Sequence, residues 1–449
     1  MGRSASTGSP SALRAPPPYD GGGKLKADSL GSVAPARHNR HNKNNFVSAY
    51  MPPPEKSVLI VTVPPVLGGI TNQSRLTADL LANHGYAPTL AWRAYYSEYP
   101  ELSVPSWRFG RGRPSVREVD GWPYPRLAVG TWLPEFEWAH HNDWQPWGSV
   151  LDRFRYHVVV SGNNLSGYGL VEHKLPSLQW IASGYMAERV DRYRTRSLPR
   201  RLFNALLNEP LTVRQERRIL ENAETIAISN YTLSSLRALT PRNCVRGIVH
   251  IPVDSARFSP AGGARAKGRR LRVGINGRLS DPRKNTQLLI DAFRIVARQR
   301  ADVDLIVRSD LDREGFLRAV NGYDLADRLD IAGPMPFAAL PDFYRSLDVF
   351  AISSWQEGLS VTGTEAMACG ATVVSTRCGG PEEFVLDGET GRLSGFEPAD
   401  FAGRLIDALD DAAGPRRLAE AGIAYIRDHF SQAGFEETFL DHFSRTFAR

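Results

Sequence analysis

The chain has 449 residues and a formal net charge of +7; 42% of its residues are hydrophobic and 23% are charged. This length predicts two or three domains, and the composition is that of a globular protein. No apolar run approaches the roughly 18 residues that a membrane-spanning helix needs. No cluster of histidine, cysteine and aspartate has metal-ligand spacing, so we expect neither a transmembrane helix nor a bound metal.

Residues 1–54 are rich in serine, proline, glycine, arginine, histidine and asparagine. Such a composition buries too little apolar surface to order itself, so we predict a disordered basic arm. The first thirty residues lack the apolar core of a secretory leader, and Cys244, Cys369 and Cys378 form no C-x-x-C pair. These features predict a cytoplasmic protein with free thiols.

Residues 55–252 are predicted to form a first α/β domain. Continuous apolar runs indicate strands buried on both faces, and apolar residues spaced three and four apart indicate helices. The first strand, a turn with Gly68 and Gly69, a helix and a second strand make a βαβ unit. The expected strands are residues 57–63, 89–92, 156–161, 178–182, 225–229 and 245–251, and the expected helices are residues 70–84 and 231–239.

Residues 93–150 are rich in aromatic residues and proline but have little periodicity, so we expect strands with long loops there. The aromatic rings suit either core packing or the apolar faces of sugars. Asn163 and Asn164 directly follow the strand expected at residues 156–161. Because ligands of open α/β sheets bind at the carboxyl ends of strands, these two asparagines are candidate ligand-binding residues.

The stretch from Arg189 to Arg218 is strongly basic. Nine arginines face three acidic residues, and leucines and a phenylalanine are interleaved with them. The pattern predicts either a basic amphipathic helix on an anionic membrane, at its inner face, or a solvated helix packed on its own domain. No recognised nucleic-acid-binding module accompanies the charge, so we expect no nucleic-acid partner.

Residues 253–270 are predicted to link this domain to a second α/β domain at residues 271–429, followed by a terminal helix at residues 430–449. The linker contains prolines, glycines and basic residues, which favour irregular backbone. The expected strands are residues 271–276, 305–307, 330–333, 350–352 and 372–375. The expected helices are residues 286–298, one ending at Leu347, residues 361–368, one beginning at Pro381 and those after residue 399.

The most informative stretch runs from Ser353 to Gly391. Glu357 and Glu365 lie eight residues apart, and small residues separate them. A helix is expected to begin after Ser360, and the unpaired N–H groups of a helix N-terminus suit phosphate. Ionised carboxylates accept hydrogen bonds from hydroxyl groups. The stretch therefore suits a ligand that carries both hydroxyls and phosphates, such as a nucleotide sugar.

The order of motifs in this stretch resembles that of the family-four (group 1) retaining glycosyltransferases. Glu-x7-Glu is followed by Ala-Met-Ala-x-Gly, then by Gly-Gly-x-x-Glu and Asp-Gly-x-Thr-Gly. The resemblance implies the GT-B fold, an α/β architecture of two facing Rossmann-like domains with a cleft between them and a C-terminal helix crossing back. The domain at residues 55–252 would then be the acceptor side, including Asn163 and Asn164, and the domain at residues 271–429 would bind the nucleotide sugar.

The same resemblance implies roles for individual residues. Glu357 would contact hydroxyls of the donor sugar, and the backbone amides of Gly358, Leu359 and Ser360 would hold the distal phosphate. Glu365 would accept the ribose hydroxyls. Further implied donor-site residues are the basic pair that clamps the diphosphate, Arg278 and Lys284, and the glycine loop, Gly68 and Gly69.

Two positions depart from the family pattern. Asn285 follows Lys284 where the family commonly has glycine, and Arg283 could share the role of Lys284. The catalytic histidine that many family members have in the first domain has no clear counterpart.

The resemblance implies an enzyme that transfers a glycosyl group with retention, without metal and with no cofactor besides its nucleotide-sugar co-substrate. The acceptor would be a glycan, a lipid-linked sugar or a small molecule, in polysaccharide or glycoconjugate synthesis. One alternative is a GT-B epimerase or hydrolase that acts on the nucleotide sugar without an acceptor. A non-catalytic GT-B binding protein is the other alternative. The sequence leaves the sugar, the nucleotide, the linkage and the acceptor open.

Overall fold

The computed structural model describes residues 54–64, 69–187, 189, 198–242, 244–262, 269–414 and 416–448. They belong to one compact unit, Pro52–Arg449. Four features predicted from the sequence lie wholly or partly outside the described residues. They are the arm at residues 1–54 apart from Pro54, Gly68 of the glycine turn, residues 190–197 of the arginine-rich stretch, and residues 263–268 of the linker.

An eight-stranded sheet forms in the first half of the chain, with the strand order β3-β4-β2-β1-β5-β6-β7-β8. Neighbouring strands are parallel, except that β3 runs antiparallel to β4. The six predicted strands are all present, although β2 already begins at Ala87 and β8 ends at Ile248. The strands are β1 (Ser57–Thr62), β2 (Ala87–Arg93), β3 (Val116–Glu118), β4 (Arg126–Val129), β5 (Tyr156–Ser161), β6 (Leu178–Ile181), β7 (Glu224–Ala227) and β8 (Val245–Ile248).

The helices that accompany this sheet include the two that the sequence predicts, α1 (Gly69–Asn83) and α7 (Asn230–Arg237). α7 begins at its expected place because the hydroxyl of Ser229 accepts a hydrogen bond from the N–H of Thr232. The remaining helices of this half are α2 (Gly148–Leu151), α3 (Tyr168–Glu172), α5 (Leu198–Phe203) and α6 (Glu209–Asn222).

A six-stranded, all-parallel sheet forms in the second half, with the order β11-β10-β9-β12-β13-β14. Its strands are β9 (Leu271–Gly277), β10 (Val303–Ser309), β11 (Leu329–Ala332), β12 (Val349–Ile352), β13 (Thr372–Thr376) and β14 (Gly391–Ser394). The strand order reverses between β9 and β12. The carboxyl ends of these two strands therefore diverge into a crevice, the place where open α/β sheets bind ligands.

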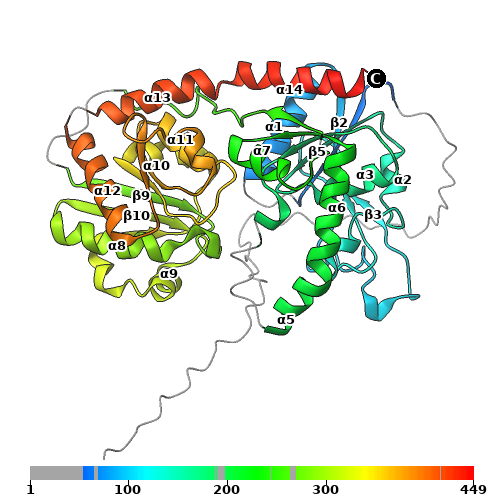
Figure 1. Cartoon of the computed structure of the whole chain (residues 1–449), viewed down its shortest axis with the longest axis horizontal. Coiled ribbons are helices and arrows are strands. Elements are labelled where there is room, and N and C mark those ends of the chain that lie inside the picture. The colour runs from blue at the N-terminus through cyan, green and yellow to red at the C-terminus, as the bar shows by residue number, and fades with distance from the viewer. Residues whose placement is uncertain are drawn as a thin grey trace, which may run out of the picture. The chain divides into compact units, whose positions relative to one another are not determined.

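In the described residues, helices α8 to α13 connect the strands of the second sheet or come directly after it. They are α8 (Thr286–Gln299), α9 (Arg313–Val320), α10 (Leu340–Ser346), α11 (Val361–Ala368), α12 (Pro398–Ala413) and α13 (Arg417–His429). α8 packs against β10, and α12 packs against α8 and against β12, β13 and β14; their apolar side chains form one buried cluster with residues of β9 (Figure 1). α11 spans the predicted residues, and Gly370 beyond it has a φ of +87°, as expected of a left-handed residue after a helix.

The prediction of a helix beginning at Pro381 is wrong. The chain forms only a short 3-10 turn, Gly380–Glu383, before β14. The hydroxyl of Thr390 accepts the N–H of Leu386 and donates to the carbonyl of Phe384. These side-chain bonds take backbone groups that a continuing helix would need, and so they end the turn.

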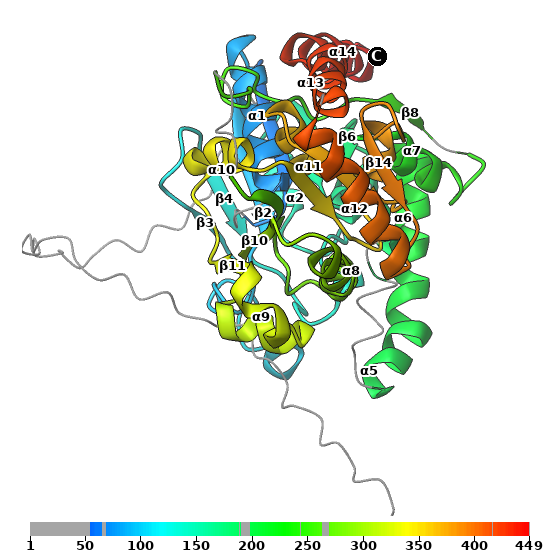
Figure 2. The ribbon, with the colours of Figure 1, turned by 90° about the vertical axis from the view of Figure 1, so that its left-hand side faces the viewer.

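The last helix, α14 (Gln432–Phe447), begins where the hydroxyl of Ser431 accepts the N–H of Gly434. Its aromatic residues pack on the first sheet, and the rings of Phe435 and Trp180 stack with centroids 5.2 Å apart. Figures 1 and 2 show α14 following α13 at the end of the chain. The predicted architecture of two Rossmann-like sheets and a returning terminal helix is thus confirmed.

The three cysteines are free, as the sequence predicts, and Cys369 and Cys378 are buried. No helix in the described part of the chain is both long enough and apolar enough to cross a membrane.

Candidate functional site

A pocket lies at the crevice between β9 and β12. Its walls come from the ends of both strands, from the loop after β9 and from the entrance of α11. The lining residues are Ile275, Asn276, Leu279, Lys284, Phe350, Ala351, Ile352, Ser353, Ser354, Glu357, Ser360 and Thr362. Three residues that the sequence places in the site, Lys284, Glu357 and Ser360, are among them.

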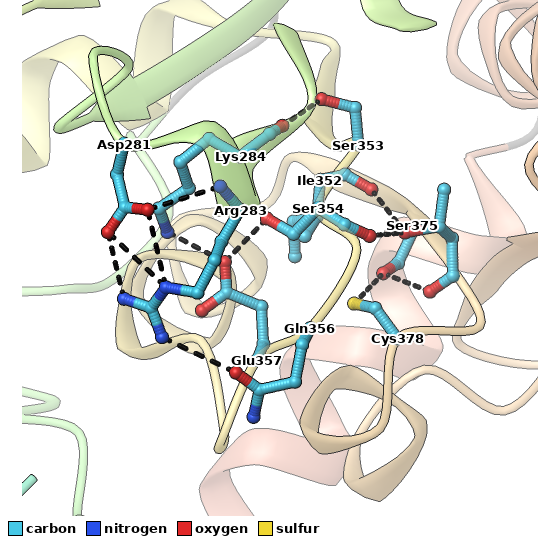
Figure 3. A network of polar contacts seen from close by, with 11 residues as sticks. Asp281, Arg283, Lys284, Ile352, Ser353, Ser354, Gln356, Glu357, Ser375 and Cys378 are labelled. Carbon is cyan, nitrogen blue, oxygen red and sulfur yellow. Dashed lines mark hydrogen bonds and ion pairs between the residues drawn. The ribbon is translucent and has the colours of Figure 1, made fainter. Parts of the chain in front are cut away.

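An ion pair joins Lys284 and Glu357 inside this pocket. The Nζ of Lys284 lies 2.6 Å from Oε1 of Glu357, and the hydroxyl of Ser354 donates to the same oxygen at 2.6 Å (Figure 3). Burial raises the pKa of Glu357, but the charge of Lys284 and the bonds from Lys284 and Ser354 outweigh it and hold the pKa below its usual value. Glu357 is therefore ionised at neutral pH, and its charge is matched by one ammonium group.

Backbone geometry presents Lys284 to the pocket. The hydroxyl of Ser353 donates to the carbonyl of Lys284 at 2.9 Å, and the next residue, Asn285, has the left-handed angles φ +46° and ψ +47°. Glycine adopts this conformation without strain, and asparagine is among the few other residues that often do. The replacement of the family's glycine by Asn285 therefore preserves the turn.

The other two basic residues of this loop have different surroundings. Arg283 donates to the carboxylate of Asp281 at 3.0 Å and to the side chain of Gln356 at 3.4 Å (Figure 3). Arg278 is exposed and does not line the pocket, and within the described residues no acidic side chain pairs with it. Of the predicted basic pair, only Lys284 thus lines the pocket, while Arg278 is exposed to solvent.

The loop before α11 has a strained residue at the helix entrance. Ser360 has φ +71° and ψ +72°, which is uncommon for a residue other than glycine, and Leu359 before it is buried. Such strain often marks a functional loop, because the surroundings must enforce it. The hydroxyl of Ser229 donates to the carbonyl of Gly358 at 2.6 Å, so the loop is also bonded to the entrance of α7.

Glu365 lies one turn into α11 and is only 7% exposed. The phenol of Tyr344 donates to its Oε2 at 3.1 Å, and the amide of Asn276 donates to the phenol at 3.2 Å. Burial raises the pKa of Glu365 to about 8, against the smaller opposing effect of the Tyr344 bond. The carboxyl is therefore mostly protonated at neutral pH, whereas the sequence suggests an ionised acceptor.

Residues 270–411 match the family described as "Glycosyl transferases group 1". The match spans the second sheet, the Lys284–Glu357 pair and α11. This part of the chain is thus similar to the group 1 glycosyltransferases.

Two named relatives illustrate the sequence similarity. A GDP-mannose-dependent alpha-(1-6)-phosphatidylinositol monomannoside mannosyltransferase of Mycolicibacterium smegmatis is 33% identical over 46% of this chain and 58% of its own length. A D-inositol 3-phosphate glycosyltransferase of Streptomyces avermitilis is 27% identical over 68% of this chain and 69% of its own length. The chain thus spans about half the length of the first of these.

Solved structures share the fold of the chain. Sucrose-phosphate synthase from Thermosynechococcus elongatus superposes with a TM-score of 0.67 at 20% identity, covering 88% of this chain and 100% of that one. Anabaena HepE in complex with UDP and glucose superposes with a TM-score of 0.62 at 15% identity, covering 87% and 100%. At these identities the likeness supports the GT-B fold alone.

The candidate residues in the first half of the chain do not line the Lys284 pocket. Gly69 is the first residue of α1, and Asn163 caps a short turn by accepting the N–H of Leu165 at 3.2 Å. Asn164 is fully buried, and its amide faces the carbonyl of Glu216 at 3.4 Å. Both asparagines therefore make hydrogen bonds within the protein. Asn164 is fully buried and exposes no surface that an acceptor could contact.

Sequence reasoning missed Ser354, Asn276 and Tyr344. Ser354 lies three residues before Glu357 and could have been found as a hydroxyl beside the motif. Asn276 and Tyr344 come from β9 and α10, and no spacing along the chain relates them to Glu365. Within the described ranges, no three histidine, cysteine, aspartate or glutamate side chains gather as a metal site would require.

Proposed function

We propose that the chain is a retaining glycosyltransferase that moves a sugar from a nucleotide-sugar donor to a sugar, glycan or lipid-linked acceptor. The observation that carries the proposal is the ion pair of Lys284 and Glu357 at the entrance of α11. A cation and the N-terminus of a helix suit a diphosphate, and a carboxylate beside them suits the hydroxyls of a sugar. The match of residues 270–411 to the group 1 family supports the same function.

The proposed chemistry needs charge stabilisation more than a nucleophile. The bond between the anomeric carbon and the diphosphate oxygen breaks, and the acceptor oxygen bonds to the same carbon on the same face. The acceptor proton passes to the departing phosphate oxygen. Lys284, Arg278 and the amides of Gly358 to Ser360 would stabilise the charge that develops on the diphosphate, so we assign no nucleophilic side chain and propose that no metal takes part.

The proposed classes of donor and acceptor are inferred from the names of similar proteins. The Mycolicibacterium smegmatis relative is named for GDP-mannose and for a phosphatidylinositol mannoside, and the Anabaena structure holds UDP and glucose. We therefore propose a GDP- or UDP-linked hexose as donor, in the synthesis of a polysaccharide or glycoconjugate. The fold alone does not choose between the two nucleotides.

A donor panel tests this proposal. The chain is incubated with GDP-mannose or UDP-glucose, with and without inositol phosphate or a phosphatidylinositol mannoside, and the released nucleoside diphosphate and the glycosylated product are measured. A transferase releases diphosphate together with product only when an acceptor is present. Release without acceptor would indicate a hydrolase or epimerase. Binding of nucleotide without turnover of any donor would indicate a binding protein.

We also propose peripheral contact with an anionic membrane through the end of the arginine-rich stretch. α5 and α6, joined through the π-helical turn Asn204–Asn208, form one rod whose α5 end extends outward in Figures 1 and 2. Leu198, Leu202 and Leu206 recur every four residues there and are 74%, 61% and 71% exposed. A leucine ridge beside exposed arginines is the pattern of a helix that lies on a bilayer surface.

Part of the predicted basic stretch serves other contacts. Arg189 pairs with Glu137 at 2.8 Å, and Arg218 pairs with Glu172 at 2.6 Å. The surface proposed for the membrane is therefore narrower than the sequence suggests: it is the leucine ridge with Arg200 and Arg201, which are both exposed.

A further inference from the structure

A second hollow lies against the first sheet and shares no lining residue with the Lys284 pocket. β1, α1, β2, the start of β4 and the loop before β4 form its walls. The lining residues are Thr62, Val63, Thr71, Ser74, Leu90, Trp92, Trp122 and Arg126.

Trp92 carries a buried donor that no protein atom accepts. The side chain is 1% exposed, and its indole N–H has no hydrogen-bond partner. The indoles of Trp147 and Trp180, which are equally buried, donate to the carbonyls of His140 and Val249 at 3.0 and 2.9 Å. An unsatisfied buried donor costs about 1–3 kcal/mol and is rare in folded proteins. An acceptor atom in the hollow would satisfy it.

Arg126, the first residue of β4, adds a positive charge to the same hollow. It is 8% exposed, and its guanidinium lies 5.9 and 5.6 Å from the ring centroids of Trp92 and Trp122. It donates only to backbone carbonyls, those of Val119 and Asp120. Within the described residues no carboxylate lies at ion-pair distance from it. Since a guanidinium has five N–H donors, three are left for another partner.

Two hydroxyl groups that line the hollow, those of Ser74 and Thr62, already donate within the protein. Ser74 donates to the carbonyl of Ile70 at 2.9 Å, and Thr62 lies 2.6 Å from Ser74 and so donates to it. No acidic residue lines the hollow. The indole N–H of Trp92 and the remaining N–H groups of Arg126 are donors available to an anion.

We infer that this hollow binds an oxyanion, a carboxylate or a phosphate monoester, that is part of the acceptor. An anion would neutralise the buried guanidinium with charge-assisted hydrogen bonds and would accept the indole N–H of Trp92. Thr62 ends β1 and Trp92 is the penultimate residue of β2, whereas Arg126 begins β4 opposite Leu90. The hollow therefore lies against the face of the sheet and extends from the register of Leu90 to the carboxyl ends of β1 and β2. The assignment to an acceptor rests on the proposed function; the anion site does not.

Indole ¹H–¹⁵N spectra of the full chain test the inference. The nine tryptophans give nine indole signals, and Trp92→Phe identifies the signal of Trp92 by its loss. Inorganic phosphate, glucuronate and neutral glucose are then titrated. The Trp92 signal should shift with phosphate or glucuronate and stay in place with glucose, and the signals of the bonded Trp147 and Trp180 should stay in place throughout. Phosphate and glucuronate separate the two kinds of oxyanion.

Two variants with opposite expectations complete the test. Arg126→Gln should weaken the anion affinity read from the Trp92 signal at least tenfold. Trp138→Phe removes another unpartnered indole N–H that does not line the hollow, and it should leave that affinity unchanged. If Arg126→Gln does not fold, Trp92→Phe, which keeps an aromatic ring, should weaken phosphate binding measured by calorimetry.

No shift of the Trp92 signal, or an equal shift with glucose, overturns the inference. Binding of GDP or UDP is measured on the same samples. Nucleotide binding without a Trp92 shift refutes only the anion site, whereas a Trp92 shift without nucleotide binding refutes the donor site of the proposed function.

Discussion

The phenol of Tyr344 donates a hydrogen bond of 3.1 Å to the carboxyl of Glu365, and this bond joins α10 to α11 behind the loop that carries Glu357. Tyr344 is fully buried, and Glu365 is nearly so. Burial disfavours the charged form of the carboxyl, which is why its pKa rises to about 8. A protonated carboxyl at this position has consequences for stability and for ligand binding.

Glu365→Gln should change how stability depends on pH. The folded pKa of about 8 lies above the ordinary value of 4.5, so this group lowers stability as pH rises between those two values. The loss is on the order of 1 kcal/mol per pH unit. The variant cannot ionise, so its melting temperature should match that of the parent near pH 4.5 and exceed it at pH 8. Calorimetric melts across this range provide the measurement, and parallel curves for the two proteins would contradict the prediction.

The two glutamates should differ in nucleotide binding. Glu365→Ala removes an expected partner of the ribose, so GDP or UDP affinity should fall about tenfold or more. Glu357→Ala should leave that affinity nearly intact, because it frees Lys284 from its ion pair, while the transfer rate falls. Titration calorimetry and single-turnover kinetics measure the two effects. The opposite pattern would reverse the roles of the two glutamates. If neither variant changes nucleotide affinity or transfer rate, the donor-site assignment is wrong.

Lys284→Ala and Arg278→Ala should each lower the transfer rate about a hundredfold, on the order of 3 kcal/mol of charge stabilisation. The matched control is Arg298→Ala, since Arg298 is an exposed arginine on α8 outside the pocket. Its rate should be unchanged. A folded Lys284 or Arg278 variant with near-normal turnover would remove that residue from the diphosphate clamp.

Transfer should continue in the presence of EDTA. The proposed charge stabilisation comes from Lys284, Arg278 and backbone amides rather than from a cation. Turnover is measured before and after chelation and after magnesium or manganese is added back. Activity that disappears with EDTA and returns with either ion would show that a metal takes part.

The leucine ridge should bind anionic vesicles. Replacing Leu198, Leu202 and Leu206 by serine should reduce sedimentation with phosphatidylserine vesicles. Arg200→Gln with Arg201→Gln should weaken it mainly at low salt, because each basic residue contributes about 1 kcal/mol near an anionic surface. Phe337→Ser, at an exposed aromatic residue of the second half, is the control. If the parent chain does not sediment with these vesicles at low salt, the ridge is not a membrane surface.

The sequence by itself determined the two-sheet α/β fold and the general position of the site. Buried strands such as Ser57–Thr62 are nearly continuous apolar runs, and α11 is framed by small residues and Gly370, so local pattern and tertiary environment agree there. The spacing of Glu357 and Glu365 and the loop with Lys284 likewise pointed to the crevice between β9 and β12. Each of these features depends on residues that are close together in the sequence.

Only the tertiary structure decided the protonation and the partners of these groups. A pKa depends on burial and on charges brought from distant parts of the chain, so Tyr344 and Asn276 could not be linked to Glu365 by spacing. The turn at Pro381 failed to become a helix because Thr390, nine residues later, takes its backbone groups. The unpartnered indole of Trp92 and the unpaired Arg126 likewise exist only where separate strands and a loop meet, because burial without a partner is a property of the assembled fold.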